Sequence, residues 1–156
     1  MQTFLPYENF KKSADVLDKK RCWKQVVEAK QILSTLEKLA KGEKPGWGNH
    51  PAVQMWVGYE PALMHYFDHF LQICIYEHRI NTKYTYLLHG VYTREDFDNI
   101  KYPWWLGNED FHRAMRARLI AKDESFYLQK FPDDKGFNDG KYFWPVMDGS
   151  KKFKTI

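Results

Sequence analysis

A single glutamate among basic and amide side chains is the first feature of this chain that points to chemistry. If the segment Leu17–Glu28 is helical, residues three, four and seven positions apart stack on one side of it. That side carries Arg21, Lys24 or Gln25, and Glu28. A carboxylate surrounded by groups that bind phosphate suits catalysis on a nucleic-acid backbone, and an ordinary network of surface charges explains the same spacing.

A second basic stretch lies late in the chain, over residues 108–122. Cations spaced along one helix can contact successive phosphates of a nucleic acid, although an ordinary basic surface helix has the same composition. Two tryptophans directly precede this stretch. Aromatic rings beside cations commonly hold an unstacked base, and burial in the core is the alternative for either ring. The residues concerned are Trp104, Trp105, His112, Arg113, Arg116, Arg118 and Lys122.

The loop between two expected helices holds a third group of candidates. Residues 41–48 have the composition of a loop, and Trp47, Asn49 and His50 stand near its end. Asn49 and His50 are suited to reading a nucleotide turned out of a duplex, and Trp47 is suited to filling the gap that it leaves. Capping of the helix that begins at Pro51 is the alternative role for Asn49 and His50.

Metal and cofactor chemistry finds little support in the sequence. His65 and His69 have the i,i+4 spacing of zinc ligands on a helix, but the glutamate of the His-Glu-x-x-His motif is missing between them. The chain has no P-loop, no dinucleotide-binding glycine motif and no serine in a nucleophile elbow. We therefore expect neither a metal ion nor a cofactor.

Length and composition favour one soluble domain over residues 1–156. The chain is 44% hydrophobic and 28% charged, which excludes a disordered protein, and its 17% aromatic content suggests stacking surfaces in addition to a core. A net charge of +4 is compatible with a nucleic-acid partner without requiring one. Cys22 and Cys74 form no metal-type pair, and no signal peptide or membrane-spanning segment is recognisable. We expect an intracellular protein, in the cytoplasm or nucleoid.

Helical periodicity and capping residues predict an all-α fold, a compact domain of about four to five helices joined by long loops rich in aromatic residues. Apolar residues recur at helical spacing over 20–41 until Gly42, and the helix that starts at Pro61 is apolar on most sides, which indicates a buried central element. Residues 81–107 are predicted to be irregular. The tail from Phe131 is expected to wrap the surface. Further helices are expected over 8–19, from Pro51, and over 108–122 with Asn108 as the cap.

Several motifs along the chain resemble, in the same order, those of the pyrimidine dimer DNA glycosylase family, to which phage T4 endonuclease V belongs. The resemblance is closest to a bacterial and viral branch of that family, and it extends over nearly the whole chain. The opening stretch is Met1–Tyr7, and Leu17–Glu28 follows, with Cys22 in place of a leucine of the family pattern. The later motifs are Trp47–Trp56, Gly58 to Glu60, Phe111–Lys122, Tyr127, Phe131–Pro132 and Trp144–Pro145.

The resemblance implies a T4 endonuclease V-like fold and DNA repair activity on UV-induced pyrimidine dimers. Carried over by sequence position, Glu28 takes the place of the family's catalytic glutamate and Arg21 that of a histidine. Arg118 and Lys122 match a late Arg-x-x-x-Lys pair.

Two arginines of the family pattern are absent near the glutamate. Val27 and Gln31 stand in their places. Contacts to base or phosphate must therefore come from elsewhere, and the candidates are Arg21, Lys24 and Gln25.

The resemblance also implies an N-terminal amine as nucleophile, and here the chain departs from the family pattern again. Enzymes of the T4 type remove the first Met and use the amine of the exposed Thr, whereas Gln2 is too large for efficient removal of Met1. The free amine is therefore expected on Met1. A neutral amine can attack the sugar C1′ and form a Schiff base.

These expectations define a DNA-repair glycosylase, with AP-lyase activity as an additional expectation. It is expected to act as a monomer, without a membrane partner, on double-stranded DNA carrying a damaged or modified base. Glu28 assists the reaction of Met1, or activates water if Met1 does not reach the sugar. Two alternatives stay open: a non-catalytic DNA-binding module on the same scaffold, and an enzyme acting on another modified base.

Overall fold

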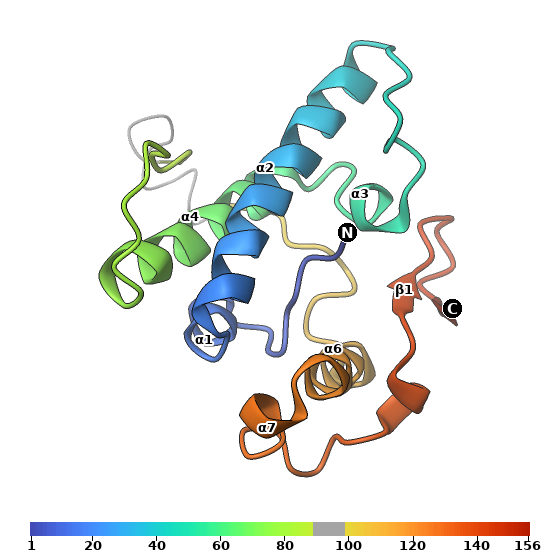
Figure 1. Ribbon diagram of the computed structural model, residues 1–156. Helices are drawn as coiled ribbons and strands as arrows, with labels where there is room; N and C mark the ends of the chain where they lie inside the picture. The colour runs from blue at the N-terminus through green and yellow to red at the C-terminus, as the bar shows by residue number, and fades with distance from the viewer. Residues whose placement is uncertain (89–98) are drawn as a thin grey trace.

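The computed structural model describes residues 1–88 and 99–156, which are mostly helical with one small antiparallel sheet (Figure 1). The predicted all-α class is confirmed. The helices are α1 (Phe10–Asp15), α2 (Lys19–Ala40), α3 (Pro51–Gln54), α4 (Glu60–Tyr76), α6 (Glu109–Lys122), α7 (Glu124–Tyr127) and the 3-10 turn η1 (Phe137–Gly140). The sheet pairs β1 (Phe143–Pro145) with β2 (Phe153–Thr155), with Phe143 opposite Thr155.

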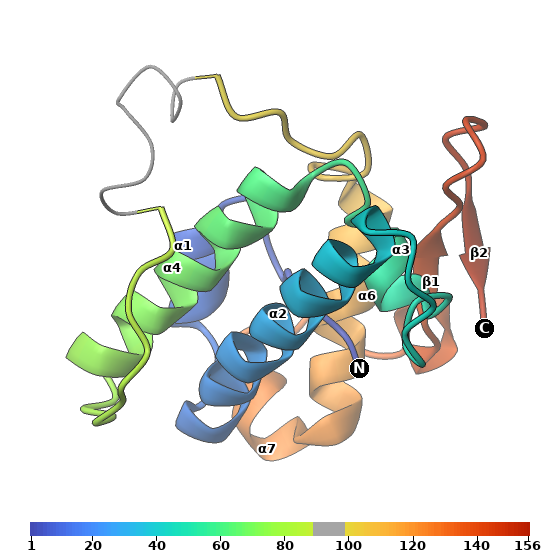
Figure 2. The same ribbon diagram turned by 90° about the horizontal axis from the view of Figure 1, so that it is seen from above.

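The centre of the fold is the pair α2 and α4, which pack side by side (Figure 2). α2 begins after Asp18, whose side chain accepts a hydrogen bond from the backbone N–H of Arg21 at 3.3 Å. It ends before Gly42, whose φ of 80° turns the chain away and which lacks the Cβ that makes such a φ unfavourable. α4 has Pro61 in its first turn, and its many buried apolar residues make it the central helix that the sequence predicts.

Large aromatic side chains fill the space beside α4. Trp56 and Trp105 are fully buried and lie edge to face, with ring centroids 5.0 Å apart. The indole of Trp56 donates a hydrogen bond to the hydroxyl of Thr3 at 3.1 Å, and the indole of Trp105 donates to the carbonyl oxygen of Met55 at 3.0 Å. Some of the many aromatic residues are therefore core residues, and the indole N–H groups of these two tryptophans have hydrogen-bond partners.

The first residues of the chain run in an extended conformation between α2 and α6, where most of them are buried (Figure 1). The backbone N–H of Phe4 donates to Oε1 of Gln25 at 2.7 Å, and the carbonyl oxygen of Phe4 accepts from the hydroxyl of Tyr66 at 2.9 Å. The carbonyl oxygen of Leu5 is 2.7 Å from Nδ1 of His112. These contacts fix the N-terminus of the chain beside the middle of α2.

The structure refines several expectations about the elements. α1 is shorter than the predicted segment 8–19, and its cap is Asn9. His50, one of the two predicted candidates, caps α3, and the tail forms β1 and β2 as well as loops. The predicted irregular region 81–107 lies partly outside the described residues, and its described parts contain no helix or strand. Within residues 1–88 and 99–156, no helix is long and apolar enough to cross a membrane.

The two cysteines are free thiols packed against each other in the core. Sγ of Cys74 donates to Sγ of Cys22 at 3.3 Å, and both side chains are buried. This hydrogen bond, followed by burial, raises the pKa of Cys22. The thiol of Cys22 is therefore a packing group rather than a nucleophile.

A buried guanidinium connects the N-terminal segment, α6 and the tail. Nε of Arg116 is 2.7 Å from Oδ2 of Asp134, and its Nη1 donates to the carbonyl oxygen of Pro6 at 2.7 Å. The other carboxylate oxygen of Asp134 accepts from Nε of Arg113 at 2.9 Å. Both Arg116 and Asp134 are less than 10% exposed, so the ion pair is nearly closed off from water.

Replacing Arg116 by alanine is expected to lower the free energy of unfolding by about 3 to 5 kcal/mol, because it leaves the carboxylate of Asp134 buried without its closest partner. Urea unfolding followed by circular dichroism measures the change. Arg113→Ala is the matched control. It removes a more exposed guanidinium from the same carboxylate, and we expect a loss of about 1 kcal/mol. Equal losses from the two variants would contradict this account of the ion pairs.

Candidate nucleic-acid site around Glu28

The carboxylate of Glu28 lies in the middle of α2 and is almost closed off from solvent. Glu28 is 8% exposed, and its Oε2 accepts a hydrogen bond from the backbone N–H of Gln2 at 3.2 Å. Nζ of Lys24, one helical turn earlier on α2, is 3.8 Å from Oε1. The i,i+4 spacing thus pairs one lysine with the acid, and the start of the chain supplies the second contact.

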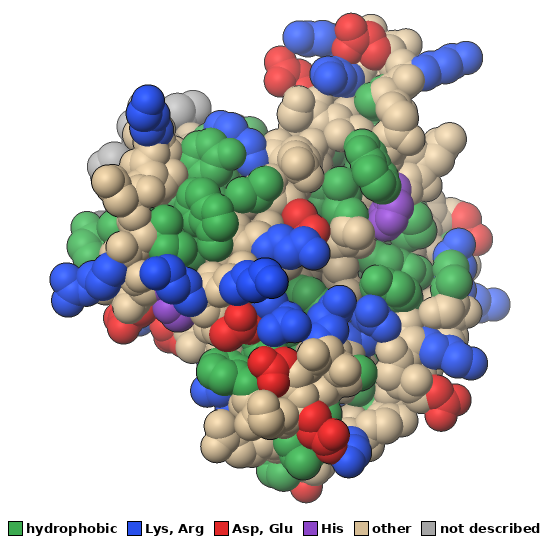
Figure 3. Space-filling view, viewed as in Figure 1, with side chains coloured by type: hydrophobic (Ala, Val, Ile, Leu, Met, Phe, Trp, Pro, Cys, Tyr) green, Lys and Arg blue, Asp and Glu red, His purple; other side chains and the backbone are tan. Residues whose placement is uncertain are grey.

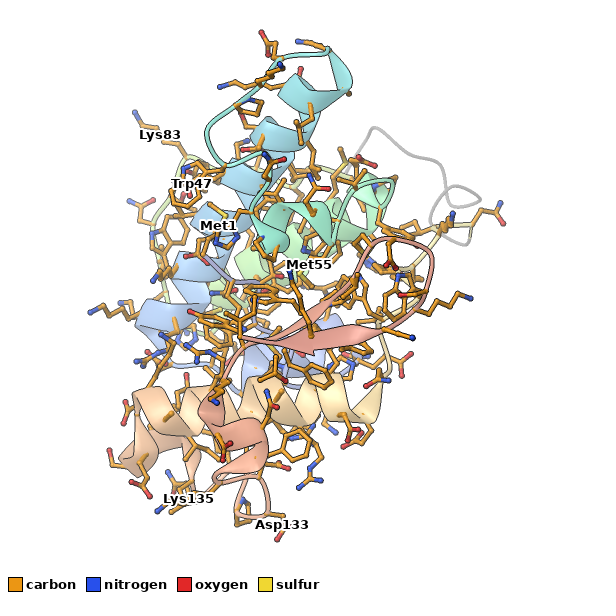
Figure 4. The ribbon with its side chains drawn as sticks, turned by 90° about the vertical axis from the view of Figure 1, so that its right-hand side faces the viewer. Met1, Trp47, Met55, Lys83, Asp133 and Lys135 are labelled. Atoms are coloured by element: carbon orange, nitrogen blue, oxygen red, sulfur yellow. The ribbon has the colours of Figure 1, made fainter. Side chains whose placement is uncertain are left out.

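The α-amino group of Met1 and the side chains of Glu28 and His50 lie close to one another. Burial, and then the positive charge of the Met1 amine, lower the pKa of His50, while the carboxylate of Glu28 acts in the opposite direction. Nδ1 of His50 accepts a hydrogen bond from the N–H of Ala52 at 3.0 Å, so Nε2 carries the proton of the neutral ring. The ring of Trp47 packs edge-on against His50, and the labels of Met1 and Trp47 fall in the same part of the view in Figure 4. Amine, carboxylate and imidazole form what we call the Glu28 cluster, made of Met1, Glu28 and His50.

Basic side chains from α2 and α6 surround the Glu28 cluster. Burial lowers the pKa of Lys122, and neighbouring cations lower it further, while the carboxylate of Glu28 raises it. These cations are Arg118, Lys24 and Arg21. In Figure 3, Lys and Arg side chains form a band across the middle of the face, between α2 and α6. Two helices far apart in the sequence therefore supply one positive surface.

Arg118 and Lys122 differ in what holds them. Nη1 of Arg118 donates to the carbonyl oxygen of Gly140 at 2.7 Å, and the guanidinium carbon lies 3.7 Å from the ring centroid of Tyr142. Lys122 forms no ion pair with a carboxylate of residues 1–88 or 99–156. Arg118 is thus oriented by the tail, whereas Lys122 has no carboxylate partner within 4 Å in the described part of the chain.

Arg21 is tied to the protein by acidic side chains. Its Nη1 is 3.3 Å from Oδ1 of Asp18 and 3.8 Å from Oδ2 of Asp123. The guanidinium carbon also lies 5.8 Å from the ring centroid of Tyr127. The positive charge of Arg21 is therefore partly compensated before any ligand arrives.

Aromatic rings lie around His50. Trp47 is 56% exposed, and its ring centroid is 5.6 Å from that of His50. The ring of Trp144 meets His50 edge to face at 6.0 Å, and Tyr142 stacks on Trp144 at 5.2 Å. Asn49 is exposed between Trp47 and His50 in the chain. An exposed indole next to cations is an arrangement that can stack on a nucleic-acid base.

Four side chains predicted to contact DNA are buried in the fold: Gln25, Trp105, His112 and Arg116. Gln25 holds the N-terminal segment, and the indole of Trp105 donates to a backbone carbonyl. Nε2 of His112 accepts from the N–H of Gly107 at 2.9 Å, and burial lowers the pKa of the ring. We therefore correct the assignment of these four residues from DNA contacts to structural positions, because a helical pattern does not tell which polar side chains have buried partners.

Two further predicted contacts, Arg113 and Trp104, are half-buried and have partners within the fold. The guanidinium carbon of Arg113 lies 4.2 Å from the ring centroid of Phe137, in addition to its ion pair with Asp134. The ring of Trp104 packs against Phe153 of β2 at 5.2 Å. Among the contacts described for residues 1–88 and 99–156, none brings either side chain into the Glu28 cluster.

Three residues of the site were not among the predicted candidates: Gln2, Tyr142 and Trp144. Gln2 is 5% exposed, and its side chain also contacts α6 through Met115 and Arg118. Trp144 belongs to one of the motifs that resemble the family, and this motif is the sequence feature that could have identified it as a site residue. Nothing in the local sequence marks Tyr142, because its contacts are with residues distant along the chain.

His65 and His69 form a separate pair on α4. Their Nε2 atoms are 2.9 Å apart, and Nδ1 of His65 is 3.0 Å from the hydroxyl of Tyr102. They line a cavity of about 240 Å³ together with Phe10 and other residues of the α1 region. In the part of the chain that the structure describes, no group of three or more His, Cys, Asp or Glu side chains is placed to hold a metal ion.

Comparison with models of known protein families shows to which family the chain belongs. A family model described as pyrimidine dimer DNA glycosylase matches residues 1–79, the half of the chain that contains Glu28, Trp47 and His50. The chain therefore belongs to the pyrimidine dimer DNA glycosylase family, as the sequence motifs predict. Comparisons with curated proteins and with solved structures gave no significant match.

The environment of His69 predicts a loss of stability in acid. Burial, and then the neighbouring His65, lower the pKa of His69 to about 4 from an ordinary value of 6.5. The native state thus favours the neutral ring, so its stabilising contribution is complete above about pH 6.5 and is lost as the pH falls toward 4. We expect the urea midpoint to fall over this range, and to fall less in His69→Gln. The exposed Gln72, changed to Ala, is the control and is expected to keep the wild-type dependence. An unchanged pH dependence in His69→Gln would contradict this assignment.

Proposed function

We propose that this protein is a DNA-repair glycosylase that excises damaged pyrimidines, such as UV-induced dimers, from double-stranded DNA, with an associated AP-lyase step. The observation that carries the proposal is a nearly buried glutamate carboxylate beside the first two residues of the chain, surrounded by cations of α2 and α6. We further propose that it acts as a monomer inside the cell. The catalytic groups of the proposal are Glu28 and the amine of Met1.

The amine of Met1 is the proposed nucleophile. Its nitrogen lone pair forms a bond to the sugar C1′, and the electron pair of the glycosidic bond leaves with the base, which takes up a proton. Loss of a proton from the nitrogen and opening of the sugar ring then give a Schiff base. The proximity of this amine to Glu28 and His50 supports the assignment.

Glu28 is proposed to act twice. Its carboxylate first stabilises the positive charge that develops on the sugar, and a group fixed by the Gln2 N–H needs no rearrangement to do so. It then accepts the C2′ proton, and the electron pair of that C–H bond forms a double bond as the 3′ phosphate leaves. If the amine does not reach the sugar, we propose that the same carboxylate activates water.

Access to C1′ requires that a nucleotide be turned out of the duplex, since the stack closes the sugar to a nucleophile. Lys24, Arg118 and Lys122 are the proposed phosphate contacts, with Arg21 partly engaged by acidic neighbours. Trp47 is exposed and is proposed to fill the gap or to stack on the displaced base, with Asn49 and His50 reading it. A dimer weakens base stacking, which lowers the free energy of extrusion.

Glu28→Gln is expected to lower the rate of glycosidic-bond cleavage in UV-irradiated duplex by about 10²- to 10⁴-fold while DNA affinity is kept, because the amide cannot accept a proton. Single-turnover assays and DNA titrations measure the two quantities. Glu37→Gln, on the same helix and exposed beside Lys41, is the control and is expected to behave as the wild type. A normal rate of glycosidic-bond cleavage by Glu28→Gln would show that Glu28 is not catalytic.

Borohydride reduction during the reaction is expected to trap a covalent protein–DNA adduct at Met1, because it reduces the Schiff base to a stable amine. Peptide mapping by mass spectrometry locates the adduct. Protein acetylated at the N-terminus is the control and is expected to give no adduct.

The same experiment separates the competing functions. Glycosidic-bond cleavage without an adduct would replace the amine by water activated at Glu28, and an adduct at Lys122 would move the nucleophile to α6. DNA binding with neither product would leave a non-catalytic module, and release of an undimerised modified base alone would change the substrate.

A further inference from the structure

A groove lined by cations and one tryptophan lies between the start of α2 and the segment that follows α4. It has a volume of about 520 Å³ and is lined by Lys19, Lys20, Trp23, Arg79, Ile80 and Asn81. We propose that this flank groove, made of these six residues, binds the phosphate backbone of the duplex to one side of the damaged nucleotide. The inference rests on the proposed function, because it states where the same DNA continues beyond Glu28.

The cations of the flank groove have no acidic partner among residues 1–88 and 99–156. Lys19, Lys20 and Arg79 are all exposed, and none of them forms an ion pair with a carboxylate of the described residues. This differs from Arg21, on the same turn of α2, which two acidic side chains hold. Cations that gather without acidic partners attract a polyanion, and the free energy of that attraction comes from released counterions.

The backbone of Arg79 provides an independent observation. Its φ is 57°, in the left-handed region, just after the end of α4, where the N–H of Ile80 bonds back to the carbonyl oxygen of Cys74 at 3.0 Å. Glycine or asparagine usually occupies such a position, because a larger side chain is unfavourable there. An arginine in an unfavourable conformation at a groove edge points to a role in binding rather than in stability.

Trp23 gives the flank groove an apolar wall. Its ring stacks on Tyr84 with centroids 5.6 Å apart and an interplanar angle of 24°, so the half-buried indole is held in place. A fixed aromatic surface beside cations fits a nucleic-acid strand, whose sugars and bases supply apolar contact next to each phosphate. A free inorganic anion would not use this wall.

The flank groove continues the positive surface of the Glu28 cluster. Lys20, Lys24 and Glu28 follow one another at four-residue steps, so they share one face of α2. The helical rise puts Lys20 about 12 Å from Glu28. That span corresponds to about three to four base pairs along a duplex. In Figure 3 the band of Lys and Arg side chains extends from the middle of the face toward the side where α2 begins and α4 ends.

The test compares salt dependence of binding to undamaged duplexes of about one and about two helical turns. In anisotropy titrations from about 50 to 200 mM salt, the slope of log K against log salt for the longer duplex is expected to shrink by about 1 in Arg79→Asn and in Lys20→Gln. The difference in affinity between the long and the short duplex is expected to shrink as well. Asparagine tolerates positive φ, so Arg79→Asn is expected to keep or raise the melting temperature.

Lys38→Gln is the matched control. Lys38 is exposed on the same helix, about five turns from Lys20, and forms no ion pair within the described residues. For Lys38→Gln, the slope of log K against log salt is expected to equal that of the wild type. The inference is overturned if Arg79→Asn and Lys20→Gln keep the wild-type slope, or if Lys38→Gln loses as much.

Glycosidic-bond cleavage by the wild-type protein separates this inference from the proposed function. If the wild type cleaves no glycosidic bond in UV-irradiated duplex, the proposed function fails whatever the slopes are. If it cleaves the bond and the slopes of the two groove variants are unchanged, only the flank groove is wrong.

Discussion

The hydrogen bond from the backbone N–H of Gln2 to the carboxylate of Glu28 determines how the rest of the molecule must be built. A backbone amide near the end of a chain can hold a side chain in place only if that end is itself fixed, and chain ends usually fray. Here the first residues are buried, with Phe4 bonded to Gln25 of α2 and Tyr66 of α4. A large part of the interior therefore serves to hold a segment without regular secondary structure, and the Glu28 cluster depends on it.

In the protein without DNA, the buried carboxylate of Glu28 and the cations around it lower the stability of the fold. A nearly buried carboxylate is unfavourable unless it is paired, and Lys24 together with the Gln2 N–H provides the pairing. Further cations bring mutual repulsion: burial lowers the pKa of Lys122 first, and the charges of Arg118 and Lys24 lower it further. A bound polyanion removes this repulsion, so the proposed DNA ligand stabilises the same surface that it recognises.

The helical framework could be predicted because its signals are local in sequence. Asn108 caps α6, Gly42 ends α2, and the four-residue step that joins Lys24 to Glu28 can be counted directly. The burial of Gln25 and Arg116 could not be predicted, since their partners lie far along the chain and residue type alone gives charge without giving neighbours. The extended N-terminal segment and the rings of the tail were missed for the same reason, because no periodicity marks a contact between distant segments.

The contacts of the tail set an order for events during synthesis. Arg118 is held by the carbonyl oxygen of Gly140 and the ring of Tyr142, and Trp144 packs on His50. Gly140, Tyr142 and Trp144 leave the ribosome after α2, α4 and α6, so these helices can assemble before the tail is available. A nascent polypeptide therefore carries the glutamate and the lysines before the tail can hold the guanidinium of Arg118, whereas the ring of His50 already has its contact with the N–H of Ala52. The surface becomes complete only when translation has passed β1, so unfinished chains lack the geometry that the mature protein brings to DNA.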